Sequence, residues 1–107
     1  MSGTYYAGDV GAELLLGPLA TGDVDGTTID SARVVAVPPQ NGAPIELAVT
    51  IASQSTGAIT LRHVTDGDVA ASGTWRLRAW YYDGATLIAS SLEFDWPVAA
   101  RRVPLPT

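Results

Sequence analysis

The chain contains no cysteine and no lysine, and it has a single histidine. Without cysteine it offers no disulfide, no thiolate metal site and no thiol nucleophile, which suits a cytosolic origin. Six arginines stand against eleven acidic residues, for a net charge of −5. Because nucleic acid is bound by a basic surface, we expect no nucleic-acid partner.

Long apolar runs are also lacking. No stretch approaches the roughly 18 residues that a membrane span needs, so we expect no membrane association. The start, MSGTYYAGD, has neither the basic residues nor the apolar segment of a signal peptide, and we expect the mature chain to begin at or near Met1. No window keeps the 3.6-residue apolar period of a long helix, and only Asp68–Ser72 is expected to form a helical turn.

Alternation of apolar and polar residues dominates the rest, as it does in half-buried strands. Turn signals, several of them Asp-Gly or Asn-Gly, recur about every ten residues and favour hairpins. The pattern predicts strands at 12–20, 32–37, 44–52, 58–64, 75–82 and 91–98, with a further short strand in Gly3–Gly8. In about a hundred residues this indicates one all-β, antiparallel β-sandwich of about seven strands, spanning residues 1–98 with a short N-terminal arm. The proline-rich residues 99–107 are expected to form an extended arm.

Residues able to carry chemistry are few and scattered. His63 shares a face with Ile59 and Leu61, which predicts a partly buried or rim histidine rather than a general base. Most carboxylates stand in turns beside glycine, where aspartate has an ordinary structural role. Asp23, Asp25 and Asp30 resemble part of a calcium loop but lack its full spacing and closing glutamate. We therefore predict no catalytic residue, no cofactor and no metal site.

The order of motifs carries a resemblance. An aromatic residue and Gly-Asp-x-Gly lead into an apolar strand in TYYAGDVGAELLL, and a Pro-x-x-Gly turn joins two strands in Thr27–Ile51. The segment Ala70–Val98 then gives a Gly-Thr-Trp strand, an Asp-Gly turn and a last strand. From Thr4 to Val98 this layout resembles small immunoglobulin-like structural proteins of tailed bacteriophages, including the N-terminal domain of phage baseplate upper proteins. The resemblance implies an immunoglobulin-like sandwich that docks in a virion, with no catalytic residue and no cofactor.

The strand at 75–82 has two unlike faces. One face holds Trp75, Leu77, Ala79 and Tyr81, which we expect to point inward against Leu92, Phe94 and Trp96. The other face holds Arg76, Arg78, Trp80 and Tyr82. Tryptophan, tyrosine and arginine are the residue types of interface hot spots, but the outer face is also compatible with a solvated surface or a sugar-binding platform. A register slip of one residue would exchange the two faces.

The terminal arm adds a second possible contact. Arg101 and Arg102 stand just outside the domain, where they either meet a neighbour or belong to a frayed end. With the resemblance, these features predict a non-enzymatic virion structural protein, an accessory component of tail, neck or capsid surface assembled in the host cytoplasm. Its partners would be other virion proteins or further copies of itself. The alternative is a carbohydrate-binding module for host attachment.

Overall fold

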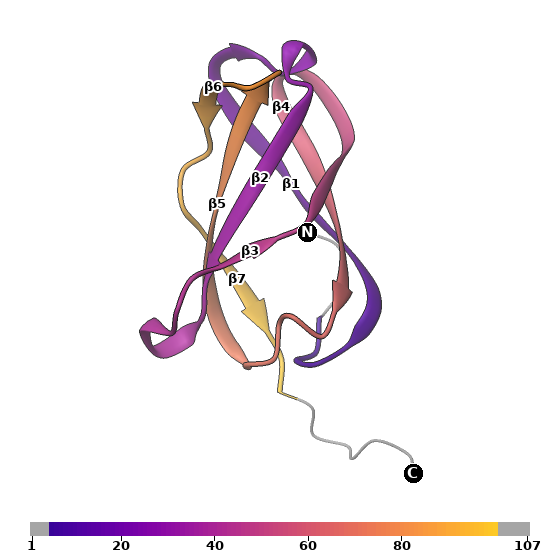
Figure 1. Cartoon of the computed structure of the whole chain (residues 1–107), viewed down its shortest axis with the longest axis vertical. Coiled ribbons are helices and arrows are strands. Elements are labelled where there is room, and N and C mark those ends of the chain that lie inside the picture. The colour runs from indigo at the N-terminus through magenta and orange to yellow at the C-terminus, as the bar shows by residue number, and fades with distance from the viewer. Residues whose placement is uncertain (1–4, 101–107) are drawn as a thin grey trace.

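The computed structural model describes residues 5–100 and shows an all-β, antiparallel sandwich (Figure 1). This confirms the predicted fold class and the predicted number of strands. Two short 3₁₀ turns, η1 (Gly26–Thr28) and η2 (Pro39–Asn41), interrupt the strands. The strands are β1 (Val10–Asp25), β2 (Ser31–Val37), β3 (Ile45–Leu47), β4 (Val49–Asp66), β5 (Gly73–Asp83), β6 (Thr86–Ser90) and β7 (Phe94–Val98).

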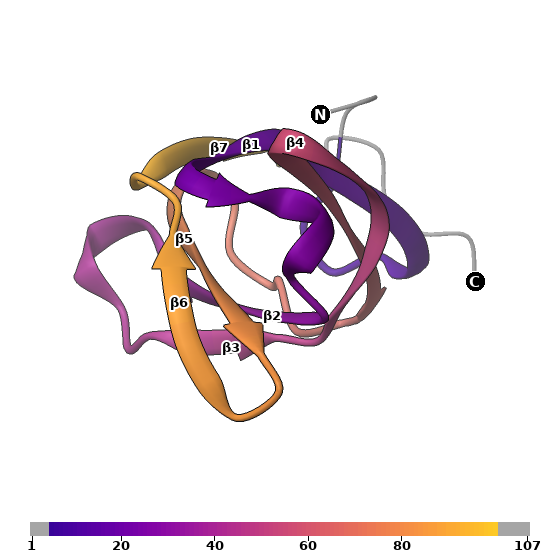
Figure 2. The same cartoon turned by 90° about the horizontal axis from the view of Figure 1, so that it is seen from above.

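The strands form two sheets that curve around a common core (Figure 2). The long strands β1 and β4 pair with each other and make up the smaller sheet. In the larger sheet β3, β2 and β5 lie in that order, and both β6 and β7 pair with the other edge of β5. β5 is therefore the central strand of the larger sheet, with β2 along one side and two short strands sharing the other.

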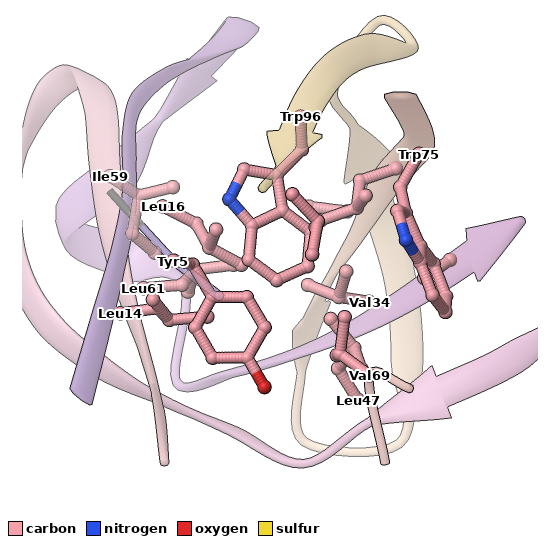
Figure 3. Close-up of a cluster of buried hydrophobic side chains, with 14 of the residues drawn as sticks. Tyr5, Leu14, Leu16, Val34, Leu47, Ile59, Leu61, Val69, Trp75 and Trp96 are labelled. Atoms are coloured by element: carbon pink, nitrogen blue, oxygen red, sulfur yellow. The ribbon is translucent and has the colours of Figure 1, made fainter. Parts of the chain in front are cut away.

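Three of the aromatic side chains in the core pack against one another: Tyr5, Trp75 and Trp96 (Figure 3). The rings of Tyr5 and Trp96 stack with centroids 5.4 Å apart, and Trp75 meets Trp96 edge-on at 6.4 Å. Beside Tyr5, Tyr6 forms a parallel bridge with Ala99. Within the described residues this bridge is what corresponds to the strand predicted in Gly3–Gly8. It ties the start of the domain to its end.

The inward face of β5 is as predicted. Trp75 is 2% exposed, and the next three inward residues are fully buried: Leu77, Ala79 and Tyr81. The one-residue slip is therefore excluded, because it would have buried Trp80 instead. Pro97 lies in β7, which pairs only with β5 and is an edge strand, a position where proline is tolerated.

Leu92 was predicted to point inward, and this is wrong: its side chain is 87% exposed. The reason lies in the link between β6 and β7, where Ser91 takes part in the sheet's hydrogen bonding through its side chain. The amide of Ala79 donates to Ser91 Oγ at 3.0 Å, and that hydroxyl donates to the carbonyl of Leu92 at 2.9 Å. The link is not a strand, so the alternation restarts at Phe94. β7 therefore begins three residues later than the strand predicted at 91–98.

The strand predicted at 44–52 is divided between the two sheets. β3 belongs to the larger sheet and β4 to the smaller one, and the chain crosses between them at Ala48. The carbonyl of Ala48 lies 2.7 Å from His63 Nδ1, which joins the crossing to the C-terminal part of β4. Alternation continues through such a crossing, so sequence periodicity does not reveal it.

The helical turn predicted at Asp68–Ser72 is absent, and the segment is an irregular loop. Two of its carbonyls are used elsewhere: that of Val69 accepts from Gly8 N at 2.8 Å, and that of Ala71 accepts from Trp75 Nε1 at 2.9 Å. Val69 itself is fully buried. Tertiary contacts thus replace the local hydrogen bonds of a helix.

Candidate functional site

The outer face of β5 is the candidate site, and strand pairing determines which residues surround it. Residues directly opposite each other in antiparallel strands share a face. On the β2 side, Arg76 stands opposite Val37 and Arg78 opposite Val35. The next two pairs on this face are Trp80 with Arg33 and Tyr82 with Ser31. The four predicted residues are therefore brought together, as expected, but with a wall of valines beside them.

Arg78 is held in one position by three contacts. Its Nε donates to the carbonyl of Ser91 at 3.1 Å, and its Nη2 donates to Ser90 Oγ at 3.0 Å. Its guanidinium carbon lies 4.5 Å from the centre of the Trp80 ring, a cation–π contact. Both Arg78 and Trp80 are only partly exposed. Arg78 is thus ordered by two hydrogen bonds and lies against the tryptophan ring.

A hollow of about 230 Å³ lies beside this pair. Its lining is mainly apolar and combines the valines of β2 with the aliphatic and aromatic parts of β5. The residues around it are Val35, Val37, Arg76, Leu77, Arg78, Trp80 and Glu93. The predicted site did not include Val35, Val37 or Glu93. The unbroken apolar run Val34–Val37 was a usable signal, because a strand with apolar residues on both faces is often covered on both.

Some charges of this face form ion pairs and others do not. Arg33 forms an ion pair with Glu46, whose hydrogen bond and charge raise the pKa of the arginine, with a smaller contribution from Tyr82. Arg62 likewise binds Glu13 at 3.2 Å. Among the described residues, neither Arg76 nor Arg78 has a carboxylate within ion-pair distance. The predicted contacts Arg101 and Arg102 lie outside the described residues.

Two acidic residues on the same face are also without an ion pair in the described part of the chain: Glu93 and Asp95. Asp95 stands opposite Arg76 in the pairing of β5 with β7, and Glu93 lines the hollow. The outer face therefore carries two positive and two negative side chains that have no intramolecular ion pair at 4.0 Å or less. A partner with both signs of charge would be able to pair them.

His63 is fully buried, at 1% exposure, and the rim position predicted for it is wrong. One ring nitrogen has a hydrogen-bond partner, because Nδ1 contacts the carbonyl of Ala48. Its Nε2 lies 3.1 Å from Asp68 Oδ2, an ion-pair distance, although the contact lacks the angles of a hydrogen bond. The histidine faces the core because β4 continues the alternation of Ile59 and Leu61. A substrate in solution would not reach it.

Two of the three aspartates in the suggested calcium loop, Asp25 and Asp30, have separate structural roles. Asp25 caps η1, accepting from the amide of Thr27 at 3.0 Å and from its hydroxyl at 2.9 Å, and these bonds lower its pKa. Asp30 accepts from the amide of Gly84 at 2.8 Å and so ties η1 to the β5–β6 turn. Over residues 5–100, no three histidine or acidic side chains come together as metal ligands would.

Tyr81 brings an unusual polar group into the core. Its side chain is fully buried, and its hydroxyl has no hydrogen-bond partner in the described structure. Burial raises the pKa of Tyr81 to about 12, because the phenolate would lose its hydration. This residue therefore contributes apolar area at the centre of β5 together with an unsatisfied hydroxyl.

Among the described residues there is no helix of the length and apolar character needed to cross a membrane. Comparison of the chain with known protein families, curated proteins and solved structures gives no match.

Proposed function

We propose that this chain is a non-enzymatic structural module that docks through the outer face of β5 onto another polypeptide chain, either a virion protein or a further copy of itself. The setting we propose is the virion of a tailed bacteriophage. We also propose that the sandwich is of the immunoglobulin-like type. It would act there as an accessory component of tail, neck or capsid surface, present in several copies. The docking role is argued from the site, and the virion setting from the order of sequence motifs.

The observation that carries the docking role is the pair of Arg78 and Trp80 beside an apolar hollow. Binding energy at protein interfaces is concentrated in a few aromatic and arginine side chains near apolar pockets. A side chain that is already ordered loses less conformational entropy on binding. The unpaired charges around the hollow supply the polar rim that such interfaces have.

A protein partner is favoured over a sugar by the position of Arg78. A pyranose stacks on an open aromatic ring face, and the guanidinium at 4.5 Å from the ring centre occupies one face of Trp80. A carbohydrate platform on Trp80 would need the guanidinium of Arg78 to move away from the ring.

The virion setting rests on the ordered motifs from Thr4 to Val98. They comprise the Gly-Asp-x-Gly lead, the paired strands of Thr27–Ile51 and the Gly-Thr-Trp strand. The two-sheet architecture and the joined ends of the domain are compatible with a compact module inserted among larger proteins. A virion component is present in a fixed copy number on a symmetric assembly. A small domain with one binding face is suited to such an assembly.

The test is to purify particles from cells that carry the gene and to measure the amount of this chain by mass spectrometry. We expect it in a fixed ratio to the major virion protein. The Trp80→Ala variant should be folded but depleted from the particles, whereas a Val10→Ala control on the opposite sheet should be incorporated normally. Absence of the wild-type chain from particles would refute the virion setting. Normal incorporation of Trp80→Ala would refute the docking face.

A further inference from the structure

Leu92 is the most exposed large apolar side chain among the described residues, at 87%. It belongs to the irregular Ser91–Glu93 link between β6 and β7, and its neighbour Glu93 lines the hollow. Ser91 anchors this link to Ala79 of β5 by two hydrogen bonds: its amide donates to the Ala79 carbonyl at 2.9 Å, and its Oγ accepts from the Ala79 amide at 3.0 Å. The leucine is therefore presented on a fixed backbone, not on a loose loop.

The link and the hollow are complementary in chemistry. The link offers an apolar knob, the side chain of Leu92, followed by the carboxylate of Glu93. The carboxylate of Asp95 comes next, at the start of β7. The hollow offers an apolar wall of Val35, Val37 and Trp80, bordered by an arginine without an ion pair, Arg76. Knob and hollow are neighbours, because Leu92 directly precedes Glu93, which lines the hollow. In a two-fold dimer, each copy would place its knob in the hollow of the other.

We infer that the partner of this face is a second copy of the same chain. The inference rests on the docking role proposed above and specifies its occupant. Leu92 of each copy enters the hollow of the other, and Glu93 of each copy pairs with Arg76 of the other. The exchange covers the exposed leucine, fills the hollow and pairs charges that have no intramolecular ion pair. Because the contact is reciprocal, it closes as a dimer and leaves no open end for further growth.

The apolar part is tested by sedimentation equilibrium of Leu92→Asp. We expect wild type to reach twice the monomer mass as its concentration rises. The dissociation constant of the Leu92→Asp dimer should be at least about tenfold higher than that of the wild-type dimer. Val10 is the matched control, because it is 74% exposed but lies on β1 of the other sheet. Val10→Asp should dimerise like wild type. If wild type stays a monomer up to about 1 mM, or if both variants lose association equally, the inference is overturned.

The charged part is tested by exchange of signs. Arg76→Glu and Glu93→Arg should each weaken the dimer, since each places like charges opposite each other twice. Mixed in equal amounts, the two variants should form a heterodimer, because both contacts then join opposite charges. Failure of the mixture to associate, while wild type does, overturns the reciprocal pairing. A hetero-partner would not produce this rescue.

The two proposals fail in different ways. If wild type is a monomer but Trp80→Ala is depleted from particles, the face docks onto another protein and the second-copy inference is wrong. If wild type dimerises as described but is missing from particles, the second-copy inference stands and the virion setting is wrong.

Discussion

The two faces of β5 are formed by alternating residues of one strand but differ in their exposure to solvent. The inward face of Trp75, Leu77, Ala79 and Tyr81 is at most 2% exposed. The outward face has comparable aromatic content but remains partly open to solvent, with Arg78 laid over Trp80. The inner aromatic residues stabilise the sandwich by removing apolar area from water. The outer ones are ordered by polar contacts and leave a hollow beside them, so their apolar area is available to a partner.

The contrast between Trp75 and Trp80 gives the largest expected effect. Trp75→Ala should lower the free energy of unfolding by about 3–5 kcal/mol, because the cavity would lie at the centre of the core. Trp80→Ala should lower it by less than about 1 kcal/mol, since a partly exposed ring and one cation–π contact are lost. Chemical denaturation of the two variants measures the difference. Equal losses would mean that the two faces do not have separate roles.

The second prediction concerns alkaline pH and the inner face. An unfolded tyrosine loses its proton near pH 10, whereas burial raises the pKa of Tyr81 to about 12 in the folded protein. Between these values the unfolded chain releases a proton that the folded chain keeps, so stability should fall as the pH rises. The slope is at most about 1.4 kcal/mol per pH unit. Denaturation curves at several pH values measure it.

Tyr81→Phe is the control for that slope and a prediction in its own right. Phenylalanine keeps the buried ring but removes a hydroxyl that has no hydrogen-bond partner in the described structure. At neutral pH we expect the variant to be more stable by about 1 kcal/mol, the low end of the penalty for an unsatisfied buried polar group. It should also lose the share of the alkaline slope that Tyr81 supplies. A less stable variant would show that the hydroxyl does have a partner.

A small stability effect is also expected at Arg78. Replacement by alanine removes two hydrogen bonds and the cation–π contact, all at a partly exposed site, and should lower the unfolding free energy by about 1 kcal/mol. Its effect on association should be larger, because Trp80 would lose the ordered guanidinium that lies against its ring. Measuring both quantities on one sample separates the two roles. A large loss of stability without loss of association would contradict the account of the outer face.

Sequence periodicity predicted the architecture and the orientation of β5 correctly, because alternation is a local property that survives folding. It was wrong about Leu92 because the Ser91 hydroxyl substitutes for part of the ladder and restarts the alternation. It also missed the crossing at Ala48, where one alternating run serves two sheets. In both places a side chain bonds to the main chain, at Ser91 or at His63, and alternation along one strand does not reveal such a bond.

Only some of the residues around the candidate site were named from the sequence. The four outward residues of β5 follow from alternation along one strand. The valines and Glu93 come from β2 and from the link before β7, and their position beside β5 depends on the order of strands in the sheet. Strand order is a property of the whole fold and cannot be derived from spacing within a segment. The hollow could therefore be found only in three dimensions.

The central claim is that the outer face of β5 serves association and not folding. Its most direct test is to determine the mass in solution and the melting temperature of the same samples of wild type and Trp80→Ala. The account predicts a wild-type dimer, a monomeric variant and melting temperatures within a few degrees once the monomers are compared. A variant that remains dimeric, or one that is monomeric only because it has unfolded, would contradict it.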